Sequence, residues 1–383
     1  MESKHCLPFL VLLAACGGPV ESLDSADPVF PGREGADASQ DPDDEAPFGG
    51  ASDGGRDAGA RDGGRVDAGG GDGGQVAAGA ALELQGERFS IGGVTRFVLG
   101  ASYFSCLYAP AATLQSDFQY LHGKGVSVVR CWVNWPIHHQ TWDTESPDNI
   151  VLVRADGTLS PLGLTRLEQV LSIAQAHGLV VDATFNQDTP HKTFSAHKAG
   201  IVAATSALKA RTNLLFDLQN ETSHYTNLPY FMSPAQVKEA RDAVKAVDPA
   251  RIVTASVTSV SALSSFVSTG DLDVGAYHCC RSTNWEGRTY TEALGARAAI
   301  GPGIPVYFQE PNRCGTGGQY ADCTDGSEFV TAATNAKRGH AAGWVFHNEE
   351  SYDLRSGTLQ GKLNAGQHDA LNRFAAALAV TPW

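Results

Sequence analysis

The chain has 383 residues, of which 42% are hydrophobic and 8% aromatic, and its formal net charge is −14. This length suits either two or three ordinary domains or one α/β barrel. A chain without a basic face gains nothing from the release of phosphate counterions, so we expect no nucleic-acid partner. Heptads, a Gly-X-Y period and long apolar runs are absent from the sequence, which excludes coiled coils, collagen and multi-span membrane proteins.

Residues 1–16 resemble the signal peptide of a bacterial lipoprotein. Lys4 precedes the apolar run Leu7–Ala15, which is shorter than the roughly 20 residues that a membrane span needs. The run leads into Leu-Ala-Ala-Cys, which resembles a lipobox, so we expect Cys16 to be acylated and to anchor the protein. An ordinary secretory signal is the alternative. Gly17 after the cysteine resembles lipoproteins sent to the outer membrane, so we expect an outer-membrane or cell-surface location, or secretion.

Residues 17–80 have the composition of a disordered linker. They hold 17 glycines in 64 positions, and 14 acidic residues against four arginines. Such a segment buries too little apolar surface to offset the entropy of ordering, and its charges repel one another. We expect it to hold a folded domain away from the membrane.

Residues 81–383 are predicted to form a single catalytic domain in which short apolar strands alternate with helices. Near-continuous apolar strands indicate a parallel sheet covered on both faces, and eight strand–helix units indicate an α/β fold, a (β/α)₈ TIM barrel. A doubly wound open sheet is the alternative. A hairpin at Leu82–Val94 is expected to close the bottom of the barrel. The predicted strands are Phe97–Ser102, Val126–Val133, Leu179–Phe185, Leu214–Leu218, Ile252–Ser256, Asp273–Tyr277, Ile304–Phe308 and Gly343–Phe346.

Helices are predicted between these strands and after the last one. Ser233 followed by Pro234 is typical of an N-cap and a first-turn proline, and Asp248-Pro249 is expected to end the same helix. The predicted helices include Leu162–His177, Ser233–Val247, Glu328–Arg338 and Gln367–Leu378.

Two glutamates stand at the ends of two predicted strands. The fourth strand leads through Gln219 and Asn220 into Glu221, and the seventh leads through Gln309 into Glu310. In a TIM barrel the carboxyl ends of the strands carry the active site. A glutamate buried there costs desolvation unless it is paired or used. Two glutamates that face one cleft are the arrangement that glycoside hydrolysis needs.

With these motifs in order, residues 82–350 resemble clan A of the glycoside hydrolases, and most closely family 5, the cellulase and mannanase family. The segment from Val128 to Trp135 is similar to the family's second strand, and Asn220-Glu221 matches its Asn-Glu pair. Tyr277-His278, Glu310 and Gly343-Trp344 follow at the family's sixth, seventh and eighth strands. The motifs that carry the resemblance are Val128–Trp135, Asn220-Glu221, Tyr277-His278, Glu310 and Gly343-Trp344.

The resemblance implies a retaining double displacement. Glu310 would be the nucleophile, kept ionised by Arg130, and Glu221 would be the acid/base, with a raised pKa. Asn220 would bind the sugar 2-hydroxyl and His278 would contact the substrate. Trp135 and Trp344 would be stacking platforms. The expected partner is a β-linked oligo- or polysaccharide bound by a monomer without a cofactor.

The sequence departs from the family pattern at several positions. Thr222 stands where cellulases have proline after the acid/base, Cys280 replaces the tyrosine that hydrogen-bonds the nucleophile, and Asn186-Gln187 replaces a segment that commonly contains histidine. Two alternatives to a glycosidase therefore stay open: a catalytically inactive, glycan-binding lipoprotein with the same barrel, and an unrelated barrel enzyme.

Motifs for other chemistries lack their context. His138-His139 has no third ligand at a suitable spacing, so we expect no metal site. The Gly-x-Ser-x-Gly match at residues 50–54 lies in the predicted linker, without the strand–turn–helix setting that a serine hydrolase needs.

Six cysteines are expected in the mature domain, in an oxidising compartment. Cys314 and Cys323 bracket a glycine-rich loop after the seventh strand, and we predict a disulfide between them. Cys279 and Cys280 are expected to point to opposite faces, and so to find different partners or stay free. The pairing of Cys106 and Cys131 is left open.

Overall fold

A computed structural model describes residues 80–135, 150–185, 193–223, 231–281, 283–314, 321 and 323–383. The predicted signal peptide with Cys16, residues 17–79 of the predicted linker, His138-His139 and Asn186-Gln187 lie outside the described residues. Within the described part of the chain, no helix is long and apolar enough to span a membrane.

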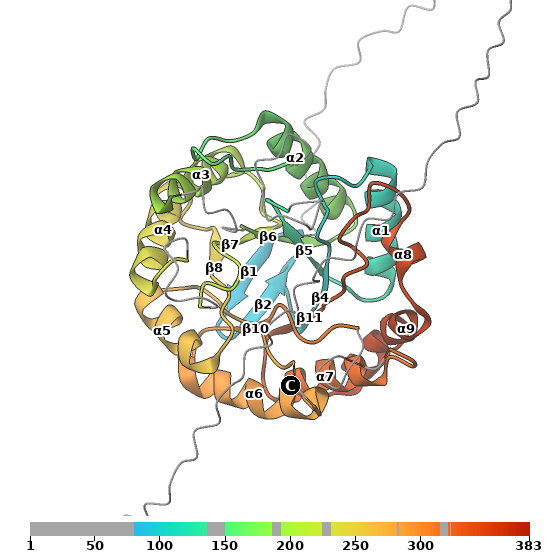
Figure 1. Ribbon diagram of the computed structural model, residues 1–383. Coiled ribbons are helices and arrows are strands. Elements are labelled where there is room, and N and C mark those ends of the chain that lie inside the picture. Colours follow the sequence, from blue (N-terminus) through green and yellow to red (C-terminus); the bar gives the residue numbers. More distant parts are fainter. Residues whose placement is uncertain are drawn as a thin grey trace, which may run out of the picture. The chain divides into compact units, whose positions relative to one another are not determined.

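Eight parallel strands form a TIM barrel, as Figure 1 shows. Their order in the sheet is β8-β7-β6-β5-β4-β11-β10-β9, and a single parallel bridge between Val257 and Tyr277 joins the two ends. The predicted (β/α)₈ fold is therefore confirmed, and the open doubly wound sheet is wrong. The strands are β4 (Val98–Ser102), β5 (Val128–Trp132), β6 (Val180–Thr184), β7 (Leu214–Asp217), β8 (Ile252–Thr254), β9 (Gly275–Tyr277), β10 (Val306–Phe308) and β11 (Gly343–Phe346).

Helices surround the barrel (Figure 1). Side chains just before the helices fix where they begin. The Ser160 side chain accepts from the Gly163 N–H at the start of Pro161–Ala176. Ser233 and Gln236 form a reciprocal capping box at the start of Pro234–Val247. The helices are α1 (Ala111–Gly123), α2 (Pro161–Ala176), α3 (Phe194–Ala207), α4 (Pro234–Val247), α5 (Val260–Gly270), α6 (Trp285–Ile300), α7 (Ser327–Arg338), α8 (Leu359–Lys362) and α9 (Ala365–Val380).

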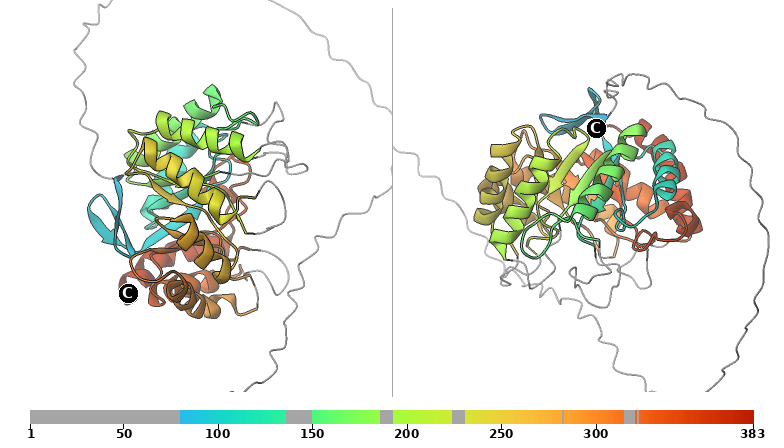
Figure 2. Two further views of the ribbon diagram at one scale, coloured as in Figure 1. Left: turned by 90° about the vertical axis from the view of Figure 1, so that its left-hand side faces the viewer. Right: turned by 90° about the horizontal axis from the view of Figure 1, so that it is seen from above.

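A small antiparallel sheet closes one end of the barrel, as predicted for Leu82–Val94. Its strands are β1 (Leu82–Gln85), β2 (Arg88–Ile91) and β3 (Val94–Arg96). Figure 2 shows this sheet at one end of the barrel. Leu82, Phe89 and Ile91 pack with the inward-facing residues of the strands in one apolar cluster. The carboxyl ends of the barrel strands therefore lie at the opposite end, which this sheet leaves uncovered.

Candidate active site

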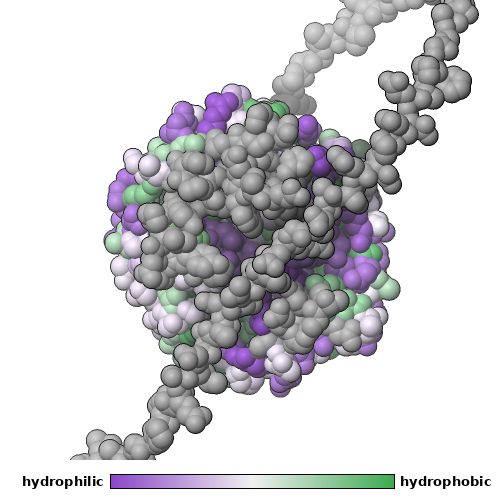
Figure 3. Space-filling model, in the orientation of Figure 1, coloured by the Kyte–Doolittle hydropathy of each residue, from purple (hydrophilic) through white to green (hydrophobic). Residues whose placement is uncertain are grey.

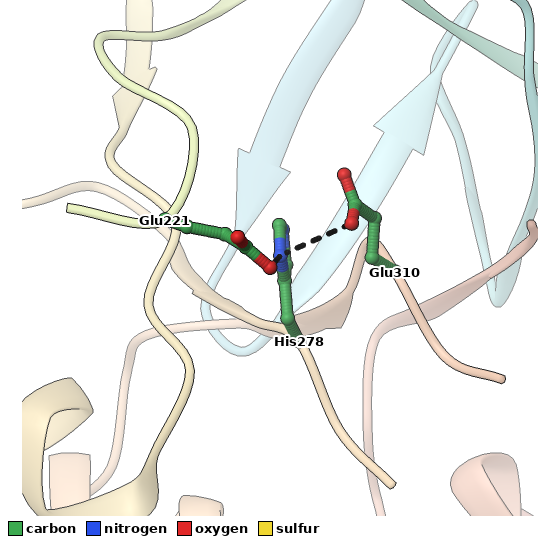
Figure 4. Close-up of side chains that lie close together, drawn as sticks. All are labelled: Glu221, His278 and Glu310. Atoms are coloured by element: carbon green, nitrogen blue, oxygen red, sulfur yellow. Dashed lines mark hydrogen bonds and ion pairs between the residues drawn. The ribbon is translucent and has the colours of Figure 1, made fainter. Parts of the chain in front are cut away.

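Two glutamates meet where the strands end. Figure 3 looks onto one end of the barrel, and hydrophilic residues are visible at its centre. Glu221 follows β7 and Glu310 follows β10, and both side chains turn toward His278, which follows β9 (Figure 4). The Nδ1 atom of His278 lies 3.0 Å from Glu221 Oε1 and 3.5 Å from Glu310 Oε2. The nearest oxygens of the two carboxylates and this nitrogen all lie within 4.8 Å of one another.

Glu221 is held in an unusual backbone conformation. Its φ is 51°, in the left-handed region that non-glycine residues seldom adopt. Its N–H donates to the Ser256 hydroxyl at 3.0 Å, and the next residue, Thr222, donates both its N–H and its hydroxyl to the Ser256 carbonyl. A proline has no N–H to donate, which gives a physical reason for threonine at position 222.

Arg130 lies fully buried beneath the two glutamates and organises the floor of the site. It donates to Glu310 Oε1 at 2.5 Å through Nη1, and to Asn220 Oδ1 at 2.7 Å through Nη2. It also donates to Thr184 at 3.0 Å and to Asp217 at 3.2 Å. A guanidinium has five N–H donors in a rigid fork, so it can fix several acceptors at once.

The electrostatics of the floor keep Glu310 ionised. Burial acts to raise the pKa of Glu310, but the neighbouring His278 and the Arg130 guanidinium outweigh it and hold that pKa well below its usual range. Asp182, beneath Arg130, is different: burial raises its pKa to about 7, against the opposing effect of Arg130. Burial also raises the pKa of Asp217. Glu310 is therefore the carboxylate that the site maintains in its charged form.

Arg281 is a site residue that the sequence reasoning missed. Its Nη2 atom donates to Glu310 Oε2 at 2.8 Å, so each oxygen of Glu310 accepts from a guanidinium. Cys280, just before it, replaces the tyrosine expected to hydrogen-bond the nucleophile, and Arg281 supplies that contact instead. The lack of that tyrosine was the only signal in the sequence that another donor had to be found.

His347 is a second residue that was missed. It follows β11, is 2% exposed, and its Nδ1 atom lies 2.9 Å from the Ser102 hydroxyl at the end of β4. Burial lowers the pKa of His347 well below its usual value, which favours the neutral imidazole. A histidine directly after a predicted strand was visible in the sequence, although no family motif marked it.

The two tryptophans expected as stacking platforms do not present open rings. Trp344 is fully buried, and its ring packs against Phe374 of α9, at 5.5 Å between centroids, so it lies outside the barrel wall. Trp135 is 3% exposed and stacks on Tyr352 at 5.0 Å, with its N–H donating to the Tyr352 carbonyl. Trp344 therefore faces away from the end of the barrel where a sugar would bind, whereas sugar binding at Trp135 stays a prediction.

The cysteines pair in two ways. Cys314 and Cys323 form a disulfide, with their Cα atoms 5.6 Å apart. Cys279 and Cys280 form a disulfide with each other, so the expectation that they point to opposite faces is wrong. That expectation applied the alternation of a strand, whereas β9 ends at Tyr277. Cys106 and Cys131 are buried free thiols.

Glu221, His278 and Glu310 have the side-chain types that hold metal ions. Their surroundings oppose a cation, because Arg130 and Arg281 already donate to both oxygens of Glu310. An added divalent ion would have to displace at least one of these guanidinium groups. The site therefore fits a metal poorly.

No protein-family model matches the chain, and no curated protein sequence matches it. Solved structures do share its fold. A putative glycoside hydrolase from Bacteroides vulgatus ATCC 8482 is 12% identical, with a TM-score of 0.58 over 79% of this chain and 62% of that one. The β-mannanase of the blue mussel Mytilus edulis is 14% identical, with a TM-score of 0.52 over 78% of this chain and 97% of that one.

A further similar structure is the endo-1,4-beta-mannanase from Eisenia fetida, which is 16% identical, with a TM-score of 0.51 over 76% of this chain and 94% of that one. At these identities the comparisons establish the barrel fold that the chain shares with glycoside hydrolases.

Proposed function

We propose that this protein is a retaining glycoside hydrolase that cleaves a β-linked glycan. The observation that carries the proposal is the approach of Glu221 and Glu310, whose nearest oxygens lie within 4.8 Å across the end of the barrel. Retaining glycosidases hold their two carboxyl groups about 5–5.5 Å apart, whereas inverting enzymes leave room for a water between them. The mannanases among the structural neighbours support a β-linked substrate.

In the first step, Oε2 of Glu310 attacks the anomeric carbon as the bond to the leaving oxygen breaks, and Glu221 gives that oxygen a proton. Glu221 then removes a proton from water, which attacks the anomeric carbon and releases Glu310. The configuration is retained after two inversions. Arg130 holds Glu310 ionised and holds Asn220, whose amide N–H₂ is left to donate to the sugar 2-hydroxyl.

Turnover of a panel of β-glucans, β-mannans and β-xylans by the purified protein tests this proposal. We expect the Glu310→Gln variant to lose at least about 10³-fold in kcat while still binding the sugar, because the amide cannot form the glycosyl-enzyme. Undiminished turnover by this variant rules out the assignment of Glu310.

A glycan-binding protein without hydrolysis is the second candidate, and one observation favours it. Arg281 covers Oε2 of Glu310, the oxygen that has to attack. This candidate predicts that the wild type binds β-glycan oligosaccharides in calorimetry but releases no reducing ends over days. Measurable turnover that depends on Glu310 excludes it.

We also propose that Cys16 is acylated and that residues 17–80 tether the domain to the bacterial outer membrane or cell surface. The lipobox-like sequence before Cys16 supports this, and acyl chains contribute about 0.8 kcal/mol per buried CH₂. Labelled palmitate should enter the wild type and not the Cys16→Ala variant in cells. Equal labelling of the two proteins contradicts the anchor.

A further inference from the structure

Arg281 covers the oxygen of Glu310 that faces the other catalytic groups. Its Nη2 atom lies 2.8 Å from Glu310 Oε2, and the same oxygen lies 3.5 Å from His278 Nδ1. The Arg281 side chain is 38% exposed, whereas that of Glu310 is 8% exposed. Arg281 therefore lies on the open side of this oxygen, where a sugar would approach.

The two guanidinium groups on Glu310 are held very differently. Arg130 is fully buried and donates to Thr184, Asp217 and Asn220 besides Glu310. For Arg281, the hydrogen bonds to the described residues go to Glu310 alone. Arg130 is thus fixed in place, while Arg281 can move away at the loss of one ion pair.

The backbone before Arg281 is constrained. Cys279 and Cys280 are joined to each other, and Cys280 has a φ of 134°, a conformation that non-glycine residues seldom adopt. Such residues cluster at ligand-binding sites. This constrained backbone lies directly before Arg281, whose side chain reaches Glu310.

Hydrolysis at this site requires Arg281 to leave Oε2. A guanidinium that gives up a carboxylate in a partly buried site needs another acceptor, and a second carboxylate matches its planar fork best. We propose that Arg281 binds a carboxylate on the sugar at the site, so that the substrate class is an acidic, uronate-bearing β-glycan. This inference rests on the proposed function and names its substrate.

The exchange explains how one arginine can serve two states. Without substrate, Arg281 pairs with Glu310, so the charge of each is compensated by the other. An acidic sugar takes Arg281 as its own ion-pair partner and frees Oε2 to attack. A neutral sugar offers no anion, so the ion pair with Glu310 persists and the nucleophile stays covered. The enzyme therefore selects acidic over neutral sugars, because only an acidic sugar frees Glu310 to attack.

The test compares each acidic glycan with its own carboxyl-reduced form, which keeps every linkage and removes only the charge. Suitable pairs are β-linked polyglucuronate, polymannuronate and glucuronoxylan with their reduced products. We expect the wild type to favour the acidic member in kcat/KM by about ten- to hundredfold, the range of one charge-assisted hydrogen bond. The Arg281→Gln variant should bring this ratio close to one, and Arg281→Lys should fall between.

A matched control is Arg288→Gln. Arg288 lies on α6, is 51% exposed at its side chain and pairs with Glu292, so its loss removes one positive charge away from Glu310 and should leave the ratio unchanged. The inference is overturned if the wild type cleaves reduced and acidic forms equally well, or if Arg281→Gln keeps the preference. A sulfated mannan preferred over every uronate also overturns the assignment of a carboxylate.

Binding separates this inference from the proposed function. Calorimetry with the Glu221→Gln variant should show acidic oligosaccharides binding more tightly than reduced ones, and the further Arg281→Gln change should remove the difference. If the wild type cleaves none of the glycans but this preference is seen, the hydrolase proposal fails and the role of Arg281 stands. If glycans are cleaved through Glu310 without any preference for charge, the hydrolase proposal stands and the role of Arg281 fails.

Discussion

Arg130 Nη1 lies 2.5 Å from Glu310 Oε1, although 180 positions separate the two residues in the chain. The barrel brings them together because Arg130 is on β5 and Glu310 follows β10, and the parallel strands end on one face. One buried guanidinium thereby fixes the charge of the proposed nucleophile and the position of Asn220.

Replacing Arg130 with methionine should lower the free energy of unfolding by about 3–5 kcal/mol, since it leaves Asp217 buried without its cation and removes one of the two guanidinium groups that pair with Glu310. Urea denaturation of the two proteins measures this change. Arg130→Lys should recover part of the stability but not activity, because one ammonium cannot replace a fork that reaches both Glu310 and Asn220. A loss below about 1 kcal/mol for the methionine variant contradicts this account of the floor.

Asn220→Ala should lower kcat/KM by about 10²–10³-fold, because a hydrogen bond to the sugar 2-hydroxyl strengthens in the transition state. A 2-deoxy glycoside of the same sugar is the matched control, since it has no hydroxyl for Asn220 to bind. On that substrate the wild type and Asn220→Ala should differ by less than about threefold. An equal loss on both substrates shows that Asn220 acts only by holding Arg130.

Asp182 should make the fold less stable as the pH rises. Because burial raises its pKa from 3.8 to about 7, the folded protein keeps a proton on Asp182 that the unfolded chain has released in this range. The free energy of unfolding should therefore fall between about pH 4 and pH 7, and Asp182→Asn should make that fall shallower. Glu310 has the opposite effect, because its pKa is lowered on folding. Its contribution to the free energy of unfolding is lost only as the pH falls below its ordinary pKa of 4.5. Parallel pH profiles for the two proteins argue against a protonated Asp182.

Phe89→Ala should cost about 3–5 kcal/mol of stability, because Phe89 is 2% exposed and packs edge-on against Tyr307 at 5.6 Å. Thermal unfolding checks this, with Val94→Ala as a control, since Val94 in the same sheet is 55% exposed. The kcat of the folded Phe89→Ala protein should match that of the wild type, because the catalytic groups lie at the other end of the barrel. If the folded Phe89→Ala protein has lost its kcat, the two ends of the barrel do not act independently.

The barrel could be predicted from the sequence because each strand is a short apolar run with a helix after it. The approach of Glu221 and Glu310 followed from their place at strand ends. The directions in which other side chains point could not be predicted, because they depend on how each strand pairs in register with its neighbours. Trp344 pairs with Leu99 and Phe308, and its neighbour Val345 belongs to the cluster inside the barrel, so Trp344 must face outward.

Arg281 lay beyond prediction for a related reason. It follows the end of β9, where the disulfide between Cys279 and Cys280 and the positive φ of Cys280 set the path of the chain. Strand alternation does not extend into such a segment, so no residue pattern placed the guanidinium on Glu310.

The anomeric form of the first product tests the central claim most directly. One-dimensional proton NMR during the first minutes of hydrolysis, before mutarotation, distinguishes the two anomers released from a β-linked oligosaccharide. If Glu221 and Glu310 act in a double displacement, the β anomer appears first, and Glu310→Gln releases neither anomer. First appearance of the α anomer would show a single displacement and contradict Glu310 as the nucleophile.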